Sequence, residues 1–351
     1  MSSTDTVWSP LAREEVIKAV ERRHPSRIPL VMAKWWGEGL WEQYGERLRY
    51  FDRYPTDLGM VWTSPLDVGA MNLSWQAKAT AAHDSRCVID DWAHLDEFIE
   101  KMPNAEHPSF DAHFEGLAQQ AAQVRAQGMY LMFSWWGLFF ERPWGLRGMG
   151  SLMVDYYEEP ENVRRLHQAL ADLYCGFLRR AARELQPDGF WTSDDLGHQT
   201  QSMMRRETFD ALIKPYYCQV GDVVRECGMH WWLHSCGNNT VLMPSLVEAG
   251  VNVFHPVQKH TMDEQAIARE FGDQMTFLVG FDVQHILQEG TPADVRAEVR
   301  YLIDTFDQPG GGMCMAAGNG IVRGTPFGNI DAFLHESLRY GTEHRARYGR
   351  E

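Results

Sequence analysis

A histidine and a cysteine two residues apart, His234 and Cys236, are the residues whose types and spacing most clearly predict chemistry in this chain. They stand at the end of a mostly apolar run, residues 229–233. If that run is a β-strand, residues two apart point to the same face, so the imidazole and the thiol converge. Imidazole nitrogen and thiolate sulfur are ligands that zinc prefers. The pair therefore predicts the beginning of a soft metal site.

Short apolar runs separated by helical patterns supply the elements that must position this pair. A strand followed by a helix, repeated along the chain, predicts parallel strands. Eight such units predict an α/β fold, a single (β/α)8 TIM barrel. A doubly wound sheet is the alternative, but no G-x-G-x-x-G turn follows an early strand. The expected strands lie within residues 28–32, 58–62, 130–133, 189–191, 229–233, 251–254, 275–279 and 312–315.

The same pattern of strands and helices predicts the boundaries of the barrel. We expect residues 1–11 to be a flexible N-terminus and residues 12–345 to form one barrel domain that opens with an N-terminal helical extension. Residues 71–88 read as a β-hairpin insertion after the second strand. The clearest helix starts at Thr291-Pro292, with Asp294 three residues after the cap.

Composition excludes several classes of partner. The chain has 351 residues and a formal net charge of −15, without the clustered Lys and Arg that nucleic-acid binding needs. No apolar stretch is long enough for a membrane span, and no signal segment is recognisable. The six cysteines lack the spacing of a disulfide framework. We therefore expect a cytoplasmic protein that binds neither nucleic acid nor membrane.

In a TIM barrel the reactive groups lie at the C-terminal ends of the strands. Those ends are unusually polar or aromatic here, which predicts one mouth lined for a small-molecule substrate. The aromatic members suggest a flat, apolar or quaternary-ammonium ligand held by stacking or cation–π contact. The expected substrate contacts are Trp35, Trp36, Trp135, Trp136, Gln199, Gln258 and Asn319.

Three residues are candidates for proton transfer. Asp194 and Asp195 are adjacent, so on a strand only one can enter the mouth while the other is free to bind backbone N–H groups. The inward carboxylate could act as a general acid or base. His255 is the alternative proton carrier, because an imidazole titrates near neutral pH.

Several motifs together resemble the uroporphyrinogen decarboxylase superfamily, over about residues 12–341. The resemblance implies a TIM barrel. It also implies one of two chemistries, because the superfamily contains cofactor-free porphyrinogen decarboxylases and zinc-dependent methyltransferases that act with corrinoid proteins, thiols or folate. The motifs are Arg27-Ile-Pro, Ser193-Asp-Asp-Leu-Gly, Lys214-Pro-Tyr-Tyr, His234-Ser-Cys-Gly, Val251-Asn-Val-Phe-His-Pro-Val-Gln, Gly280-Phe-Asp, Gly290-Thr-Pro-Ala-Asp-Val and Thr325-Pro-Phe-Gly-Asn-Ile.

Departures from the decarboxylase pattern favour the methyltransferase-like or another branch. Ser64 aligns with the position at which true decarboxylases carry a catalytic Asp, and Met32-Ala-Lys-Trp-Trp-Gly replaces their Arg-rich loop. A substrate with many carboxylates needs several cations around it, since each unpaired buried carboxylate is costly. An authentic uroporphyrinogen decarboxylase is therefore not expected.

The same resemblance implies zinc at His234 and Cys236, with a second cysteine from the last βα loop. Asn319 stands at that position, and Cys314 precedes it by five residues. We take Asp282 as the third ligand. Cys314, His255 and Asp195 remain alternatives.

The expected function is metal-dependent methyl transfer from a small, partly apolar or aromatic methylated substrate, of the demethylase type. A corrinoid or tetrahydrofolate would carry the methyl group, the corrinoid on a separate protein, and the family makes a homodimer plausible. One alternative is a metal-free decarboxylase of a small aromatic or heterocyclic acid, with Asp194 or Asp195 protonating the carbanion. Another is a non-catalytic binder of a tetrapyrrole or corrinoid.

Overall fold

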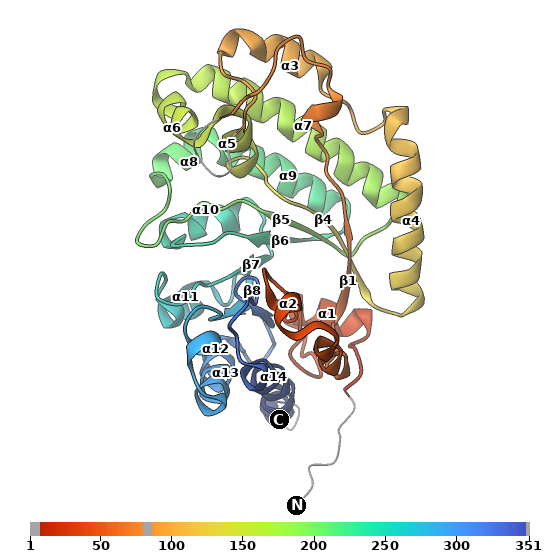
Figure 1. Ribbon diagram of the computed structural model, residues 1–351, viewed down its shortest axis with the longest axis vertical. Coiled ribbons are helices and arrows are strands. Elements are labelled where there is room, and N and C mark those ends of the chain that lie inside the picture. Colours follow the sequence, from red (N-terminus) through yellow and green to blue (C-terminus); the bar gives the residue numbers. More distant parts are fainter. Residues whose placement is uncertain (1–7, 80–85, 349–351) are drawn as a thin grey trace, which may run out of the picture. The chain divides into compact units, whose positions relative to one another are not determined.

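The chain divides into two compact units, each assembled from separate stretches of sequence (Figure 1). The computed structural model describes residues 8–79 and 86–348. The first unit comprises Met1–Gly59, Val124–Leu131 and Asn252–Glu351, and the second comprises Met60–Gln123 and Met132–Val251.

The N-terminal segment is anchored where the structure describes it. The Leu11 backbone N–H donates to Asp57 Oδ1 at 2.7 Å, and Arg27 Nη2 donates to the Ser9 carbonyl at 2.9 Å. Arg27 also forms two bonds of 2.7 Å to the Asp57 carboxylate, which is fully buried. Two residues of the expected flexible N-terminus, Ser9 and Leu11, thus form hydrogen bonds to the rest of the unit, and residues 1–7 lie outside the described residues.

Three parallel strands form the sheet of the first unit. They are β7 (Val253–His255), β8 (Thr276–Phe281) and β9 (Met313–Ala317). Val253 lies opposite Thr276, and Phe277 lies opposite Met313. All three strands occur where the sequence predicts them.

The expected strand at residues 28–32 is reduced to one parallel bridge between Leu30 and Met315. Met315 N donates to the Pro29 carbonyl and Val31 N donates to the Met315 carbonyl, so the pairing is genuine but short. Pro29 has no N–H to extend it, and Met32 has φ of 52°, which breaks the extended backbone.

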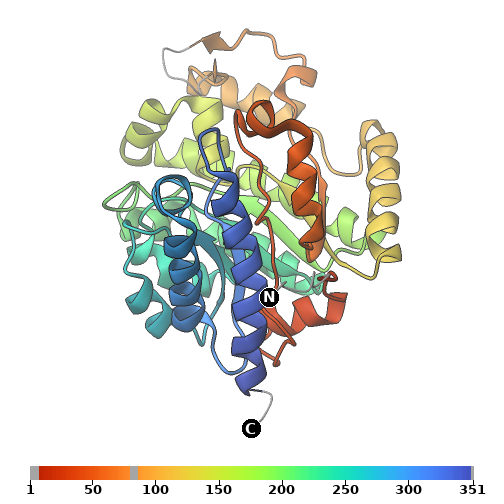
Figure 2. The same ribbon diagram turned by 60° about the horizontal axis from the view of Figure 1, so that its bottom comes forward.

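Helices alternate with these strands. Thr291 and Asp294 form the capping box that the sequence predicts at the start of α13. Figure 2 shows α13 and α14 packed side by side. The helices of the first unit are α1 (Arg13–Val20), α2 (Leu40–Tyr44), a 3₁₀ helix (Gly45–Arg53), α11 (Glu264–Phe271), α12 (Ile286–Glu289), α13 (Pro292–Phe306) and α14 (Phe327–Tyr348).

The second unit has its own parallel strands, β5 (Gly189–Ser193) and β6 (His230–His234), which pair from Gly189 opposite His230 to Ser193 opposite His234. Two further strands, β1 (Leu58–Trp62) and β4 (Tyr130–Trp135), cross the boundary between the units. Beside β5, Trp135 of β4 lies opposite Thr192. Side chains alternate along these strands, so Trp191 and His234 share one face of the sheet.

The helices of the second unit cover this sheet, with the amphipathic α7 packed against α9 (Figure 1). Within the segment expected to form a hairpin, β2 (Lys78–Ala79) and β3 (Arg86–Cys87) pair antiparallel, and residues 80–85 lie outside the described part of the chain. The other elements are α3 (Leu95–Lys101), α4 (Asp111–Ala126), α5 (Glu141–Arg147), α6 (Met149–Glu158), α7 (Pro160–Glu184), α8 (Arg206–Leu212), α9 (Lys214–Glu226) and α10 (Met243–Glu248), with 3₁₀ turns at Val68–Ala70, Trp92–His94, Pro108–Phe110 and Thr240–Leu242.

Candidate functional site

Three potential metal ligands converge in the second unit: Asp195, His234 and Cys236. His234 ends β6, and Asp195 follows β5 by two residues. Cys236 Sγ lies 3.3 Å from His234 Nε2, which lies 3.6 Å from Asp195 Oδ1. A nitrogen, a sulfur and an oxygen donor at these separations fit one zinc ion with a coordination position left open. We call these three residues the His-Cys-Asp group.

Two glycines allow the loops that carry these ligands to touch. Gly237 has φ of +79°, and a Cβ there would lie 2.4 Å from the Gly197 carbonyl carbon. A Cβ on Gly197 would in turn lie 2.5 Å from the Cys236 carbonyl oxygen. Only the absence of side chains permits this approach. It brings Asp195 beside Cys236, whose backbone N–H donates to Asp195 Oδ1 at 2.9 Å.

One buried amide holds the His-x-Cys turn in shape. Asn239 Nδ2 donates to the carbonyl oxygens of Ser235, Cys236 and Gly237 at 3.0, 3.1 and 3.1 Å. The Ser235 hydroxyl donates to Asn239 Oδ1 at 3.0 Å and accepts from Leu196 N at 3.0 Å. Asn239 therefore fixes the orientation of Cys236, as supporting residues around metal ligands do.

His234 is suited to donate a lone pair. Its side chain is 4% exposed, and burial lowers its pKa to about 4. The imidazole is therefore neutral at pH 7, the form in which histidine binds metals.

Asp194 occupies a different environment from its neighbour. It is fully buried and accepts backbone N–H bonds from Phe139, Phe140 and Glu141, and Tyr217 donates its hydroxyl to Oδ2 at 2.7 Å. Burial raises its pKa to about 6, although these bonds favour the carboxylate. Both oxygens are committed to the start of α5. These contacts position the start of α5, and the catalytic role of Asp194 stays a prediction.

Glu141 is a functional candidate that the sequence analysis missed. The Ser193 hydroxyl donates to its carboxyl group and accepts from Gly137 N at 3.0 Å. Burial, with the charges of Asp195 and Asp194, raises the pKa of Glu141 to about 8. It is therefore mostly protonated at pH 7. An acidic residue at the start of a helix is ordinary, so the sequence carries no signal for this role.

Tryptophans line the same face of the sheet. Trp136 stacks on Trp62, with centroids 5.5 Å apart and planes at 17°, and lies edge-on to Trp191 at 4.6 Å. The Trp136 and His234 rings are 6.2 Å apart. Trp136 is 45% exposed and Trp62 37%, so both offer ring surface to a ligand. Trp62 is absent from our expected contacts, because a Trp in a strand usually indicates core.

Two expected substrate contacts in this unit fit less well. Trp135 is fully buried and packs on Tyr174 and Phe190, at 5.4 and 4.3 Å between ring centroids. Because it is adjacent to Trp136, Trp135 points to the opposite face of the strand, and its contact with substrate stays a prediction. Gln199 is exposed in the loop after Asp195.

The remaining predicted residues lie in the first unit. His255 is buried, with Nε2 3.2 Å from the Ala317 carbonyl oxygen. Cys314 is fully buried in β9, which raises the pKa of its thiol well above the usual range. Asp282, our choice of third ligand for zinc, forms a group with His260 and His285 instead. Neither of the two groups of potential ligands found among the described residues contains His255 or Cys314.

Four other expected contacts are also in the first unit. Trp35 and Trp36 are partly buried, and Trp36 lies 5.6 Å from the Phe51 ring. Asn319 is exposed and its Oδ1 accepts from the Gly320 N–H at 2.7 Å. The carbonyl of Gln258 accepts from the backbone of Thr261 and Met262.

Comparison with known proteins identifies the family of this chain. The model of the family described as "Uroporphyrinogen decarboxylase (URO-D)" matches residues 145–340, more than half of the chain. The chain belongs to the uroporphyrinogen decarboxylase family. This confirms the resemblance seen in the sequence. The match includes every member of the His-Cys-Asp group.

Solved structures agree with the fold. A methyltransferase from Methanosarcina mazei is similar with a TM-score of 0.67 and 12% identity, over 94% of this chain and 98% of that one. A D-psicose 3-epimerase from Clostridium cellulolyticum H10 has a TM-score of 0.40 and 12% identity, over 76% and 95% of the two chains. Only the first likeness has a TM-score above 0.5, and at 12% identity it concerns the fold alone. Together with the parallel βα repeats, it confirms an α/β, barrel-like architecture. A search of curated proteins gave no match.

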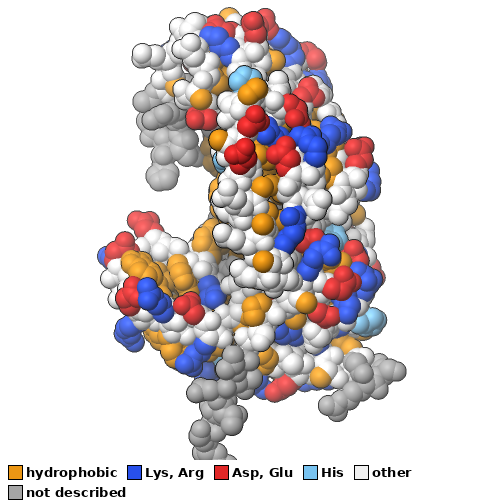
Figure 3. All heavy atoms as spheres, turned by 90° about the vertical axis from the view of Figure 1, so that its right-hand side faces the viewer, with side chains coloured by type: hydrophobic (Ala, Val, Ile, Leu, Met, Phe, Trp, Pro, Cys, Tyr) orange, Lys and Arg blue, Asp and Glu red, His pale blue; other side chains and the backbone are white. Residues whose placement is uncertain are grey.

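Among the described residues, no helix combines the length and apolarity that crossing a membrane requires. On the face in Figure 3, acidic and basic side chains are interspersed.

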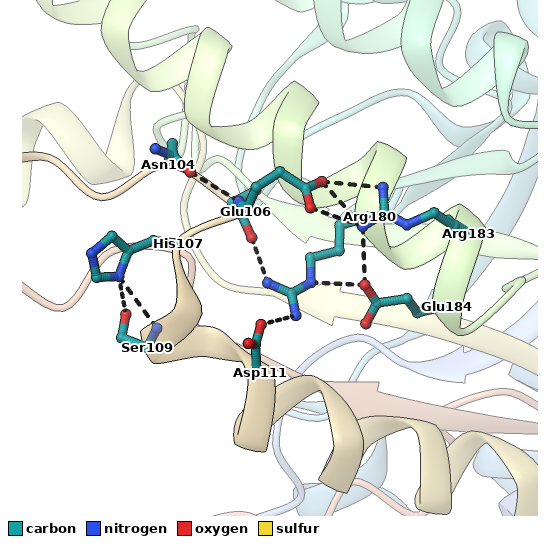
Figure 4. A network of polar contacts seen from close by, with 9 residues as sticks. Asn104, Glu106, His107, Ser109, Asp111, Arg180, Arg183 and Glu184 are labelled. Atoms are coloured by element: carbon teal, nitrogen blue, oxygen red, sulfur yellow. Dashed lines mark hydrogen bonds and ion pairs between the residues drawn. The ribbon is translucent and has the colours of Figure 1, made fainter.

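A cavity of about 870 Å³ adjoins Ser64, the residue that replaces the decarboxylase Asp in our alignment. His113, which also lines it, lies 2.8 Å from Thr63 Oγ1. Next to it, Arg180 of α7 binds the Ala105 carbonyl, Asp111 and Glu184 (Figure 4). This network holds the loop before α4, which forms part of the cavity wall.

Proposed function

We propose that this chain is a metal-dependent methyltransferase that acts on a small, partly apolar or aromatic methylated substrate. The observation that carries the proposal is the His-Cys-Asp group, in which imidazole, thiol and carboxylate lie within 4.8 Å of one another. Family membership supports it, because His234 and Cys236 occupy the positions that the resemblance assigns to zinc. Asp195 supplies the third donor in place of the residue that is Asn319 here.

His234, Cys236 and Asp195 would hold the metal. When bound, a zinc ion supplies Lewis acidity that converts a thiol into a thiolate or polarises the heteroatom of a methyl donor. The protein holds the imidazole neutral by burial and fixes the cysteine through Asn239. These arrangements prepare the ligands before a substrate arrives.

Glu141 and the tryptophans would act on the substrate. Burial raises the pKa of Glu141 to about 8 in the metal-free protein, and we assign this residue the role of giving a proton to a departing heteroatom and recovering it from solvent. The stacked Trp62 and Trp136 offer an aromatic surface that suits a flat ring or a quaternary ammonium group.

The methyl carrier in this proposal is a corrinoid or tetrahydrofolate. A corrinoid would arrive on a separate protein or as a free cofactor. Pairing of two copies into a homodimer is part of the same proposal and follows family habit alone.

The test uses methylcobalamin with a panel of small thiols, and cob(I)alamin with methylated amines and methoxylated aromatics. Zinc-loaded protein should cleave or form the cobalt–methyl bond, seen as a change in corrinoid absorbance, and Cys236→Ala should abolish this. Cys227→Ala, a cysteine at the end of α9, is the matched control. Equal rates with and without protein across the panel would contradict methyl transfer.

One observation favours a second function, decarboxylation without metal. The protonated Glu141 could protonate a carbanion after a small aromatic or heterocyclic acid loses carbon dioxide. Mass analysis of products separates the two functions, because one loses carbon dioxide and the other transfers a methyl group. A ligand-dependent spectrum without turnover would instead indicate a binding protein.

A further inference from the structure

A second group of potential metal ligands lies in the first unit: His260, Asp282 and His285. His260 is in the loop after β7, Asp282 directly follows β8, and His285 is the residue before α12. We call these residues the His-His-Asp group. They contain no sulfur and come from two loops, so they differ in chemistry and origin from the His-Cys-Asp group.

The carboxylate of this group is held in place by the backbone. Asp282 Oδ1 accepts from the N–H groups of Gln284 and His285 at 3.0 and 3.2 Å, and Oδ2 accepts from Ile286 N at 3.3 Å. Its side chain is only 6% exposed. These bonds fix its direction, as supporting hydrogen bonds do for metal-binding carboxylates.

Both imidazoles approach the same carboxylate oxygen. His285 Nδ1 lies 3.3 Å and His260 Nε2 lies 3.9 Å from Asp282 Oδ2, and the rings are 5.2 Å apart at 90°. The longer distance exceeds a hydrogen bond. In a tetrahedral site with bonds of about 2.0–2.1 Å, neighbouring ligand atoms lie roughly 3.3 Å apart. The two distances from the histidine nitrogens to Asp282 Oδ2 therefore suit three ligands around a shared cation at least as well as hydrogen bonds between the histidines and the carboxylate.

The surroundings leave the group available to a cation. The side chains of His260 and His285 are 61% and 58% exposed. The nearest lysine in sequence, Lys259, is paired with Glu264 and Glu298, so its charge is compensated. A net charge of −15 also favours cation binding over the whole protein.

We propose that His260, Asp282 and His285 bind a divalent first-row transition-metal ion of the zinc and cobalt class. Two nitrogens and one oxygen suit such ions, whereas calcium and magnesium prefer oxygen alone. Because both histidines are exposed, the remaining coordination positions face water, which a substrate oxygen or nitrogen can replace.

The experiment measures zinc and cobalt binding by tag-free protein after removal of bound metal with a chelator. His234→Ala/Cys236→Ala removes the other group, so binding that remains reports on this one. Isothermal titration and elemental analysis should then find one equivalent. Adding His260→Ala/His285→Ala should abolish it, and either histidine substitution alone should weaken binding at least about 10-fold. His335→Ala, an exposed histidine of α14, should leave binding unchanged.

Two results would overturn the proposal. One is no stoichiometric zinc or cobalt in the His234→Ala/Cys236→Ala protein. The other is equal binding after His260 and His285 are also replaced. Thermal unfolding and circular dichroism of each variant would show whether it is folded.

Discussion

The His-Cys-Asp group and the His-His-Asp group have equal numbers of potential ligands but opposite surroundings. In the first, His234 is buried beside Trp136 and Trp191, and Asn239 braces the turn that carries Cys236. In the second, two exposed imidazoles meet one carboxylate held by backbone N–H groups. If both groups bind metal as we propose, burial and a sulfur ligand would make the first site selective and preorganised, whereas exposed nitrogen and oxygen ligands would make the second an open one.

The largest expected effect comes from removing the sulfur. Cobalt-loaded wild-type protein should show sulfur-to-cobalt charge-transfer absorption, because only the His-Cys-Asp group contains a thiolate ligand. Cys236→Ala should lose this band and bind metal at that group more than about 100-fold more weakly, since loss of a ligand exceeds the effect of a supporting residue. Cys227→Ala should keep the band. A band that survives Cys236→Ala would remove the distinction between the groups.

The pH dependence of stability tests the burial of His234 in the metal-free protein, together with His167, the other histidine in this unit whose pKa burial lowers to about 4. An unfolded imidazole binds a proton near pH 6.5, so the unfolded chain takes up protons between about pH 6.5 and 4 that the folded chain refuses. The contribution of each of these two histidines to the free energy of unfolding should therefore fall by about 3 kcal/mol as pH decreases through this window. Asp194 and Glu141, whose pKa values burial raises, contribute in the opposite direction.

Urea unfolding at several pH values gives the measurement. His167→Gln keeps a donor for the Leu212 carbonyl, which His167 Nδ1 contacts at 2.8 Å, while removing its titration. It should reduce the net uptake of protons on unfolding in this window by about one, and His335→Ala should not. An unchanged slope in His167→Gln would show that the imidazole is not held neutral.

Asn239→Ala tests whether Asn239 supports the His-Cys-Asp group alone. It removes an amide that donates to three carbonyls, so the free energy of unfolding should fall by about 2 kcal/mol. Metal affinity of the His-Cys-Asp group should fall about 10- to 100-fold, and that of the His-His-Asp group should not change. Asn162→Ala, a half-buried asparagine in the first turn of α7, is the control. Equal weakening of both groups would indicate general unfolding rather than loss of support.

The smallest expected effect concerns the aromatic surface. Trp136→Ala should raise KM for an aromatic or quaternary-ammonium substrate about 10-fold, which corresponds to one lost stacking contact. Its effect on metal binding should be negligible. Trp41→Ala, an equally exposed tryptophan at 52%, serves as control in steady-state kinetics. An unchanged KM for Trp136→Ala would remove this residue from substrate recognition.

The sequence predicts the strands well, because each is a short apolar run between helical patterns. The predicted strand at residues 28–32 is shorter in the structure, because Pro29 has no backbone N–H donor and the positive φ of Met32 interrupts the extended backbone. The hydrophobicity pattern reveals neither effect. The His-x-Cys pair is likewise readable from its spacing at a strand end, although β6 ends at His234 and Cys236 lies in the turn that Asn239 holds.

The rest of the site depends on contacts between distant residues. Glu141 meets Ser193 across 52 positions, and Asp195 reaches Cys236 because Gly197 and Gly237 let two loops touch. Asp282 lies at a strand end as expected, yet its neighbours are His260 and His285. Periodicity places each side chain on an element, but only the packed loops show which side chains meet.

X-ray absorption of zinc bound to the His260→Ala/His285→Ala protein tests the central claim most directly, because only the His-Cys-Asp group then remains. We expect the zinc to have one sulfur neighbour at about 2.3 Å and nitrogen or oxygen neighbours at about 2.0–2.2 Å. A zinc shell without sulfur, or no stoichiometric zinc in this variant, would contradict it.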